Sequence, residues 1–145
     1  MIEQPAVAVH VAGHAVVALA FGLPLGHATA AEHDPGVTLL ADAPDGMTCP
    51  RQLAAVHAAG LAVEHLALGD IHAEACTGGD LVALACLDAD PGQASADAAG
   101  VLIPAACRVA YLAEALARRG TLTGRTLSAW WRGHTLPGEV VRRVA

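Results

Sequence analysis

The sequence contains no lysine, and its basic residues are eight arginines spread along 145 residues. Without lysine there is no phosphate-binding loop of the GxxxxGK[ST] type, because that loop places an ammonium group on the phosphates. The formal net charge is −6 and no basic run is present, whereas nucleic-acid binding needs clustered cations on the phosphate backbone. We therefore expect neither ATP nor nucleic acid as a partner.

Charged residues make up only 15% of the chain, and apolar residues make up 54%. A chain of this composition has enough apolar surface to fold rather than stay disordered. Its length suits one domain with its own core and is short for two. The sequence therefore predicts a single domain over residues 1–145.

Charge is missing altogether from residues 5–26, a stretch long enough for a membrane-spanning helix. The stretch is mostly alanine and valine, it carries two histidines, and Pro24 lies near its end, so we expect a buried helix and no membrane segment. The preceding MIEQP has an acid where a secretory signal has basic residues. The four cysteines never approach C-x-x-C spacing, which indicates reduced, mostly buried thiols and a cytoplasmic protein.

Glycine, proline and the spacing of apolar residues predict a mainly α (α+β) fold with one small β-hairpin. The hairpin falls on GHATAAEHDPGVTLLA, around the turn HDPG. Gly60, inside the second helix, costs about 1 kcal/mol relative to alanine, which predicts that another backbone passes close to it. The expected helices cover about residues 4–21, 51–69, 80–87, 94–119, 124–132 and 137–145.

Two histidines in VHVAGHAVVA (residues 9–18) have the spacing of metal ligands. His10 and His14 are four residues apart, so on a helix they share one face. This is the H-E-x-x-H arrangement of zinc metallopeptidases with Val11 in place of the glutamate. The spacing alone is also compatible with two core or helix-surface histidines, because the chain contains eight histidines.

The wider context resembles the FtsH family of zinc metallopeptidases. Residues 8–30, AVHVAGHAVVALAFGLPLGHATA, are similar to the family's metal-binding helix, A-x-H-E-A-G-H-A-(L/V)-V-A, and its following hairpin. Residues 58–81, AAGLAVEHLALGDIHAEACTGGDL, resemble G-R-A-A-E-E-(I/L)-x-F-G-x-x-T-T-G-A-x-N-D-L, in which the last Asp is the third zinc ligand. Residues 111–131, YLAEALARRGTLTGRTLSAWW, are similar to the family's closing helices.

The resemblance implies an FtsH-type peptidase fold, with zinc held by His10, His14 and Asp80, and hydrolysis of a peptide or small amide substrate. From the residue types alone, two imidazoles and one carboxylate make a three-ligand zinc site that leaves a fourth position open, as catalytic sites do. The other reading is a site that has decayed together with the glutamate. The sequence therefore predicts zinc as the cofactor.

Three departures from the family pattern affect the expected activity. Val11 cannot serve as the general base, and loss of positioned acid/base catalysis costs about 10²- to 10⁴-fold in rate. The 145 residues include neither the ATPase module nor the membrane anchor of the family, so we expect a substrate that is small or already extended. The segment before Asp80 is about two residues longer than the family pattern and has lost its Thr-Thr and Asn.

That segment gains His72, Glu74 and Cys76. Glu74 or His72 is a candidate for a relocated acid/base, and Cys76 for a fourth ligand if the turn before Asp80 is helical. Alternatively, all three are ordinary loop residues, since loops vary freely.

Two further features have structural readings. Glu64 aligns with one of the paired acids in the family pattern. Because it lies within an apolar helix, we expect it to form a hydrogen bond with a buried partner. Trp130 and Trp131 supply most of the aromatic area, which predicts either internal packing or a contact between copies in a homo-oligomer. The remaining histidines (His27, His33, His57, His65 and His134) have no partner at a diagnostic spacing and are expected to be surface or core residues.

Two functions fit the sequence. The first is a stand-alone zinc metallopeptidase-like hydrolase whose activity is weak or altered because of Val11. The second is an inactive pseudopeptidase that keeps the metal and binds a peptide or a protein. Survival of all three ligands favours the first, and loss of the glutamate favours the second.

Overall fold

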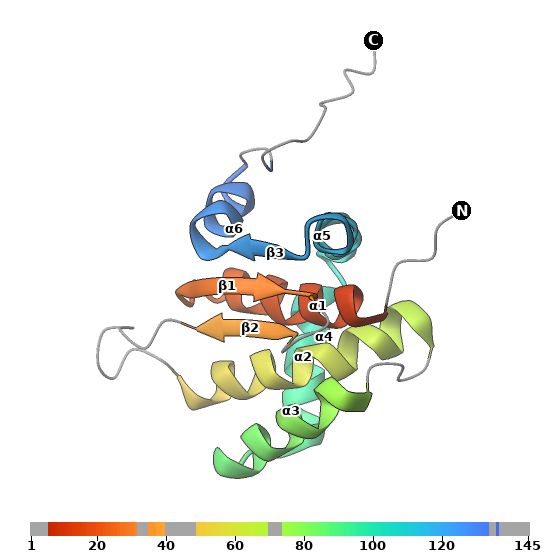
Figure 1. Cartoon of the computed structure of the whole chain (residues 1–145). Helices are drawn as coiled ribbons and strands as arrows, with labels where there is room; N and C mark the ends of the chain where they lie inside the picture. Colours follow the sequence, from red (N-terminus) through yellow and green to blue (C-terminus); the bar gives the residue numbers. More distant parts are fainter. Residues whose placement is uncertain (1–5, 32–34, 40–48, 70–73, 134–135, 137–145) are drawn as a thin grey trace.

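The first helix, α1, is an alanine- and valine-rich segment that lies inside the molecule. The computed structural model describes residues 6–31, 35–39, 49–69, 74–133 and 136, without the side chains of residues 68 and 74–79. In chain order the elements are α1 (Ala6–Ala20), β1 (Leu25–Thr29), β2 (Gly36–Leu39), α2 (Pro50–Leu68), α3 (Glu74–Cys86), α4 (Pro91–Leu102), α5 (Ala106–Arg119), β3 (Thr121–Thr123) and α6 (Gly124–Trp131). The expectation of a mainly helical fold is thus confirmed (Figure 1).

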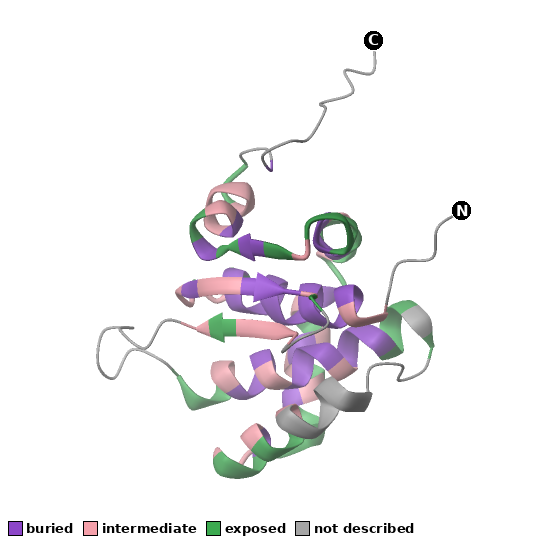
Figure 2. Cartoon of the chain, in the orientation of Figure 1, coloured by how far each residue is buried: buried purple, intermediate pink, exposed green. Residues whose placement is uncertain are grey.

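Helix α1 packs between α2 on one side and α5 on the other. Its residues are buried from Ala8 to Leu19, as Figure 2 shows. Gly13 is required at the crossing with α2, because a Cβ there would overlap the side chain of Val63 and the carbonyl of Ala59. Glycine at this position lets the two helices approach closely, which fixes the distance between the faces that carry the site.

Helix α2 is the central helix, and its ends follow the sequence signals. Pro50 is at its first position, and Gly69, in the left-handed conformation, ends it by donating its backbone N–H to the His65 carbonyl. One face packs on α1, while the opposite face joins α3 and α4 in a smaller apolar cluster. The predicted burial of this helix is confirmed for its middle but not for its two ends, where Pro50 and Arg51 are exposed and Leu66 is 51% exposed.

The sheet has three antiparallel strands in the order β2-β1-β3. The predicted hairpin is confirmed by the pairing of β1 with β2, and its turn HDPG lies in part outside the described residues. Strand β3, which pairs with the other edge of β1, was not predicted, because three residues are too few for a recognisable alternation. Thr123 caps α6 as expected, with its side chain accepting from the Thr126 N–H.

The expectation of one helix over residues 94–119 is wrong. The chain forms α4 and α5, which meet at a bend of 92°. Pro104 lies in the break, where its ring and missing N–H stop a helix. Helix α4 also begins earlier than expected, with Asp90 accepting from the Gly92 N–H at its start. Residues 137–145, where a last short helix was expected, lie outside the described part.

Helix α3 begins at Glu74, six residues before the expected start at Asp80. The pair Gly78-Gly79 indicates a loop in the sequence, because each glycine destabilises a helix by about 1 kcal/mol relative to alanine. Asp80 consequently lies in the middle of a helix. A mid-helix position holds the backbone of Asp80 more firmly than a loop would.

Two other expectations can be compared with the structure. Among the described helices, none is by itself long and apolar enough to cross a membrane, and only the sharply bent pair α4 and α5 reaches that length and composition together. The prediction of mostly buried thiols is wrong for Cys49, Cys86 and Cys107, which are free and exposed. Each lies near an end of a helix (α2, α3 and α5), where the chain meets solvent.

Candidate metal centre

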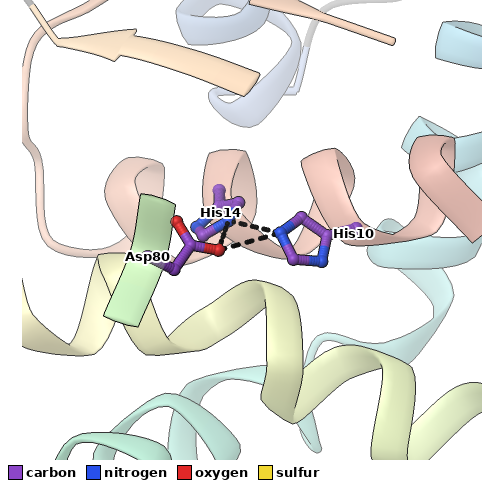
Figure 3. A group of neighbouring side chains, drawn as sticks. All are labelled: His10, His14 and Asp80. Carbon is purple, nitrogen blue, oxygen red and sulfur yellow. Dashed lines mark hydrogen bonds and ion pairs between the residues drawn. The ribbon is translucent and has the colours of Figure 1, made fainter. Parts of the chain in front are cut away.

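Three predicted ligands come together where α1, α2 and α3 meet. His10 and His14 lie one turn apart on the buried face of α1 and are 1% and 6% exposed, and Asp80 reaches them from α3 (Figure 3). Oδ2 of Asp80 lies 2.9 Å from Nε2 of His10 and 3.0 Å from Nε2 of His14, and the two Nε2 atoms are 3.0 Å apart. The arrangement brings together all three residues that the sequence assigned as ligands.

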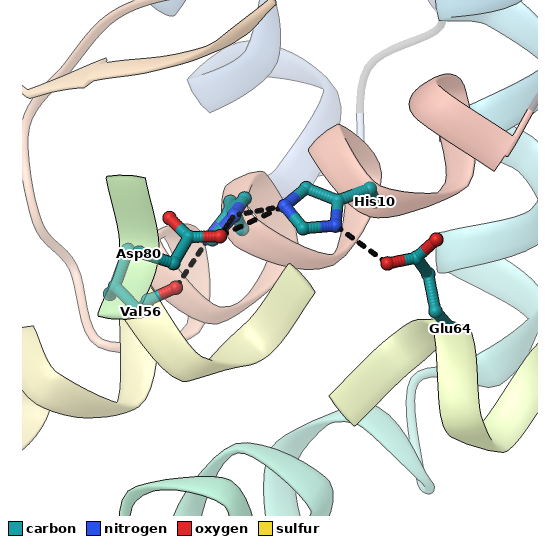
Figure 4. Close-up of polar contacts among 5 residues, drawn as sticks. His10, Val56, Glu64 and Asp80 are labelled. Carbon is teal, nitrogen blue, oxygen red and sulfur yellow. Dashed lines mark hydrogen bonds and ion pairs between the residues drawn. The ribbon is translucent and has the colours of Figure 1, made fainter. Parts of the chain in front are cut away.

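The outer nitrogens of the two imidazoles are both used as donors. Nδ1 of His14 bonds to the backbone carbonyl of Val56, and because a carbonyl oxygen only accepts, this nitrogen carries the proton. Nδ1 of His10 lies 2.9 Å from Oε2 of Glu64 and donates to that carboxylate (Figure 4). When a ring is neutral, its Nε2 atom therefore carries no proton, and the lone pair of that atom points at Asp80.

Three electron-pair acceptors thus converge on one point: two imidazole nitrogens and a carboxylate oxygen. Such a group repels itself unless protons or a cation lie between its members. Zinc bonds of 2.0 to 2.2 Å in tetrahedral geometry place ligand atoms about 3.3 to 3.6 Å apart, and the present separations of 2.9 and 3.0 Å are a few tenths of an ångström shorter. His10, His14 and Asp80 lie close enough to bind a metal ion.

Gly60 of α2 provides the space that this group faces. A Cβ at residue 60 would overlap the imidazole of His10 and Nε2 of His14. The sequence predicted that a backbone passes close to Gly60, and the nearest atoms in the structure are those of the two rings. The missing side chain lets both imidazoles lie directly against α2, and the ligand atoms that this brings together fit a metal ion.

The charges of the site shift the pKa values of its groups. Burial raises the pKa of Asp80, but hydrogen bonds from His10 and His14 outweigh it and lower that pKa to about 2. Burial lowers the pKa of His10, while its bonds to Asp80 and Glu64 outweigh this effect and raise that pKa above 6.5. In the metal-free protein, a proton on the His10 ring therefore takes the place of a cation.

Glu64 behaves as expected, since it is 0% exposed and accepts the His10 proton. Val11, the position of the missing base, is 0% exposed and belongs to the main hydrophobic core. Glu74 is the first residue of α3, and Cys76 precedes Asp80 by one turn of the same helix, but their side chains are outside the described part. His72 lies outside the described residues.

His57 is a neighbour of the site that the sequence did not single out. It is half-buried on α2. Burial lowers its pKa, and the charge of His14 adds to this while that of Asp80 opposes it. A signal for His57 was present in the sequence. Val56, Gly60 and Glu64 are four residues apart and so share the helix face that contacts the ligands, and His57 lies in this segment.

Among the described residues, His27, His65 and the two tryptophans do not belong to this group. His65 is exposed on α2, His27 bonds to Thr38 across the sheet, and positions 33 and 134 are outside the described residues. Trp130 stacks on Tyr111 with ring centroids 5.8 Å apart, and Arg108 lies 4.2 Å over the ring of Trp131. Of the two readings of the tryptophans, internal packing is thus observed.

No family model, no curated protein and no solved structure matches this chain. The resemblance to the FtsH family therefore depends on the three motifs quoted above.

Proposed function

We propose that this chain is a zinc-binding domain of the FtsH peptidase type, which holds the metal through His10, His14 and Asp80 and hydrolyses peptide or small amide substrates weakly. The observation that carries the proposal is the convergence of Nε2 of His10, Nε2 of His14 and Oδ2 of Asp80. The Nδ1 atom of each ring bonds to a different partner, Glu64 or Val56. Without a metal, this arrangement needs an additional proton on a buried imidazole, and burial disfavours that charge.

The surroundings of the ligands support a metal. Metal-bound histidines usually donate their other N–H to a carboxylate or a backbone carbonyl, which orients the ring and fixes its tautomer. His10 has such a partner in Glu64 and His14 in Val56. Zinc in a two-His, one-carboxylate site supplies a Lewis acid that polarises a carbonyl and makes water more acidic.

The residues of this chain limit what the site does with a substrate. Val11 offers no atom that accepts a proton, and it is enclosed by core side chains. Loss of a positioned base lowers the rate by about 10²- to 10⁴-fold. We therefore expect hydrolysis that is far slower than that of a peptidase with the complete motif.

The second candidate is a pseudopeptidase that binds zinc and a peptide or protein without cleaving it. The full burial of Val11 favours it, because the position of the lost base now contributes to the hydrophobic core. Hydrolysis of casein by the zinc-loaded protein separates the two. Slow cleavage that stops on removal of zinc and is absent in Asp80→Asn supports the enzyme, and binding of casein without cleavage supports the pseudopeptidase.

Cys76 bears on the same choice. It lies in α3 four residues before Asp80, so a fourth, sulfur ligand is a specific alternative to an open position. X-ray absorption of the zinc-loaded protein tests it, since a thiolate scatters at about 2.3 Å. Only nitrogen and oxygen neighbours support the open site of an enzyme, while a sulfur neighbour would make the metal structural.

A further inference from the structure

Helix α2 contributes more to the site than its glycine. Val56, Gly60 and Glu64 contact the ligands, and their spacing of four residues puts them along one face. Figure 4 shows Val56 beside Asp80 at one end of the site and Glu64 behind His10 at the other. His57 follows Val56 directly and precedes Gly60 by three residues, so it belongs to the Asp80 end of this face.

The exposure of His57 sets it apart from its neighbours. Val56 and Ala58 are buried, while His57 is half-buried, which places its ring between the interior and solvent. The charges of His14 and Asp80 both act on this ring. Among the described residues, the group whose ligand atoms all lie within 4.8 Å of one another contains His10, His14 and Asp80 without His57. His57 is therefore outside this ligand group, at the solvent edge of the helix face that contacts it.

A general base in a metal-dependent hydrolase needs this kind of position. It must reach the water that attacks the substrate without occupying a coordination position. Burial and the nearby His14 lower the pKa of His57, which keeps its ring neutral and able to accept a proton at neutral pH.

We propose that His57 is the general base and acid of the hydrolysis proposed above, in place of the carboxylate that Val11 lacks; this inference rests on that proposed function. An unprotonated ring nitrogen of His57 accepts a proton from water as the water oxygen forms a bond to the substrate carbonyl carbon. The C–N bond then breaks, and the imidazolium returns the proton to the leaving nitrogen. The products are a carboxylic acid and an amine.

Casein cleavage by zinc-loaded variants tests this role. His57→Ala and His57→Gln should each lose about 10²- to 10⁴-fold in rate while keeping full zinc occupancy. The matched control is His65→Ala, because His65 is exposed on the same helix, and its rate should not change. Equal rates for the His57 variants and the wild type would overturn the proposal.

A second set of variants separates catalysis from a structural role. With Val11→Glu in place, a carboxylate supplies the base, so His57→Ala should cost far less than it does in the wild type. A structural role of His57 would lower the rate by the same factor in both backgrounds. That result would contradict the proposal even if the first test had shown a loss.

Nitrogen-15 NMR of labelled histidine rings gives a readout that does not depend on activity. On addition of one equivalent of zinc, the His57 signals should move without taking the shift of a coordinated nitrogen, and the His65 signals should stay. Unchanged His57 signals overturn this inference and leave the metal site intact. A coordinated His57 nitrogen overturns it as well, because the ring is then a fourth ligand. If zinc does not bind at all, both this inference and the proposed function fail. Zinc binding without any cleavage by the wild type overturns the proposed hydrolysis together with the base role, whereas zinc-dependent cleavage that is unchanged in His57→Ala removes the base role alone.

Discussion

Nδ1 of His10 on α1 lies 2.9 Å from Oε2 of Glu64 on α2, and both side chains are almost completely withdrawn from solvent. A buried carboxylate is costly unless it is paired, so this contact satisfies Glu64 and at the same time orients the imidazole. The two residues are 54 positions apart in the sequence, and their contact joins α1 to α2. It links the stability of the core to the geometry of the metal centre.

Glu64→Gln should weaken zinc binding about 10- to 100-fold, because an amide holds the His10 ring less firmly and makes it a poorer ligand. Isothermal titration with zinc measures this change. Glu114→Gln on the exposed surface of α5 is the control, and its affinity should equal that of the wild type. Unchanged affinity in Glu64→Gln would mean that the carboxylate serves only the core.

Gly60→Ala should abolish metal binding, because the added Cβ would overlap the His10 and His14 rings. Gly100→Ala is the matched control: it lies in helix α4 with nothing within 4 Å of the added Cβ, and alanine there should stabilise the protein by about 0.5 to 1 kcal/mol. Zinc content and thermal unfolding of the two variants provide the measurement. A Gly60→Ala protein that is folded and binds zinc like the wild type would place the metal elsewhere.

The stability of the metal-free protein should depend on pH through Asp80 and His10. The pKa of Asp80 is lowered from 3.8 to about 2, so its contribution is present above pH 3.8 and is lost as the pH falls towards 2. The pKa of His10 is raised above 6.5, so its contribution is complete below pH 6.5 and is lost as the pH rises through the higher folded value. Thermal unfolding of the metal-free protein should therefore show a maximum between about pH 4 and 6.5.

Zinc should reverse the upper part of this profile. Because imidazole must be neutral to bind a metal, the stabilisation by zinc should be larger at pH 7.5 than at pH 5.5. The difference in melting temperature with and without zinc, measured across this range, tests the prediction. A difference independent of pH would argue against histidine ligands.

The sequence predicted those features that local chemistry decides. The caps of α2 and α6 follow from Pro50, Gly69 and Thr123, and the spacing of His10 and His14 follows from the helical repeat. Features that depend on packing were missed. Residues 74–79 form a helix despite two adjacent glycines, and the reason for Gly60 is a pair of side chains brought from another helix.

His57 illustrates the same limit within the site. Its distance in sequence from His14 and Asp80 hides the relationship, which arises only when α1 and α2 cross. Pro104 is a different case, since its effect was readable: a proline inside a helical pattern signals a break. The apolar composition on both sides of Pro104 suggested continuity, and the proline decided the outcome.

Val11→Glu should lower the melting temperature, because it places a carboxylate where a fully buried valine packs against the core. In the His57→Ala background, which lacks the base proposed above, it should also raise casein cleavage by the zinc-loaded protein, by a factor within about 10² to 10⁴, since residue 11 follows the first ligand as the base does in H-E-x-x-H. Val11→Gln is the control, with a similar size and polarity but no base. It should lose stability without gaining activity. Equal activity of the two variants, with zinc bound in both, would favour the binding-protein alternative.

The central claim is that His10, His14 and Asp80 hold one metal ion per chain, and metal analysis of the purified protein tests it most directly. Zinc content per chain, measured by mass spectrometry after dialysis, should be one in the wild type and in His65→Ala. It should be close to zero in His10→Ala, His14→Ala and Asp80→Asn, because two remaining ligands bind zinc weakly. A wild-type protein without metal after growth in zinc, or full occupancy in all three ligand variants, would contradict the account.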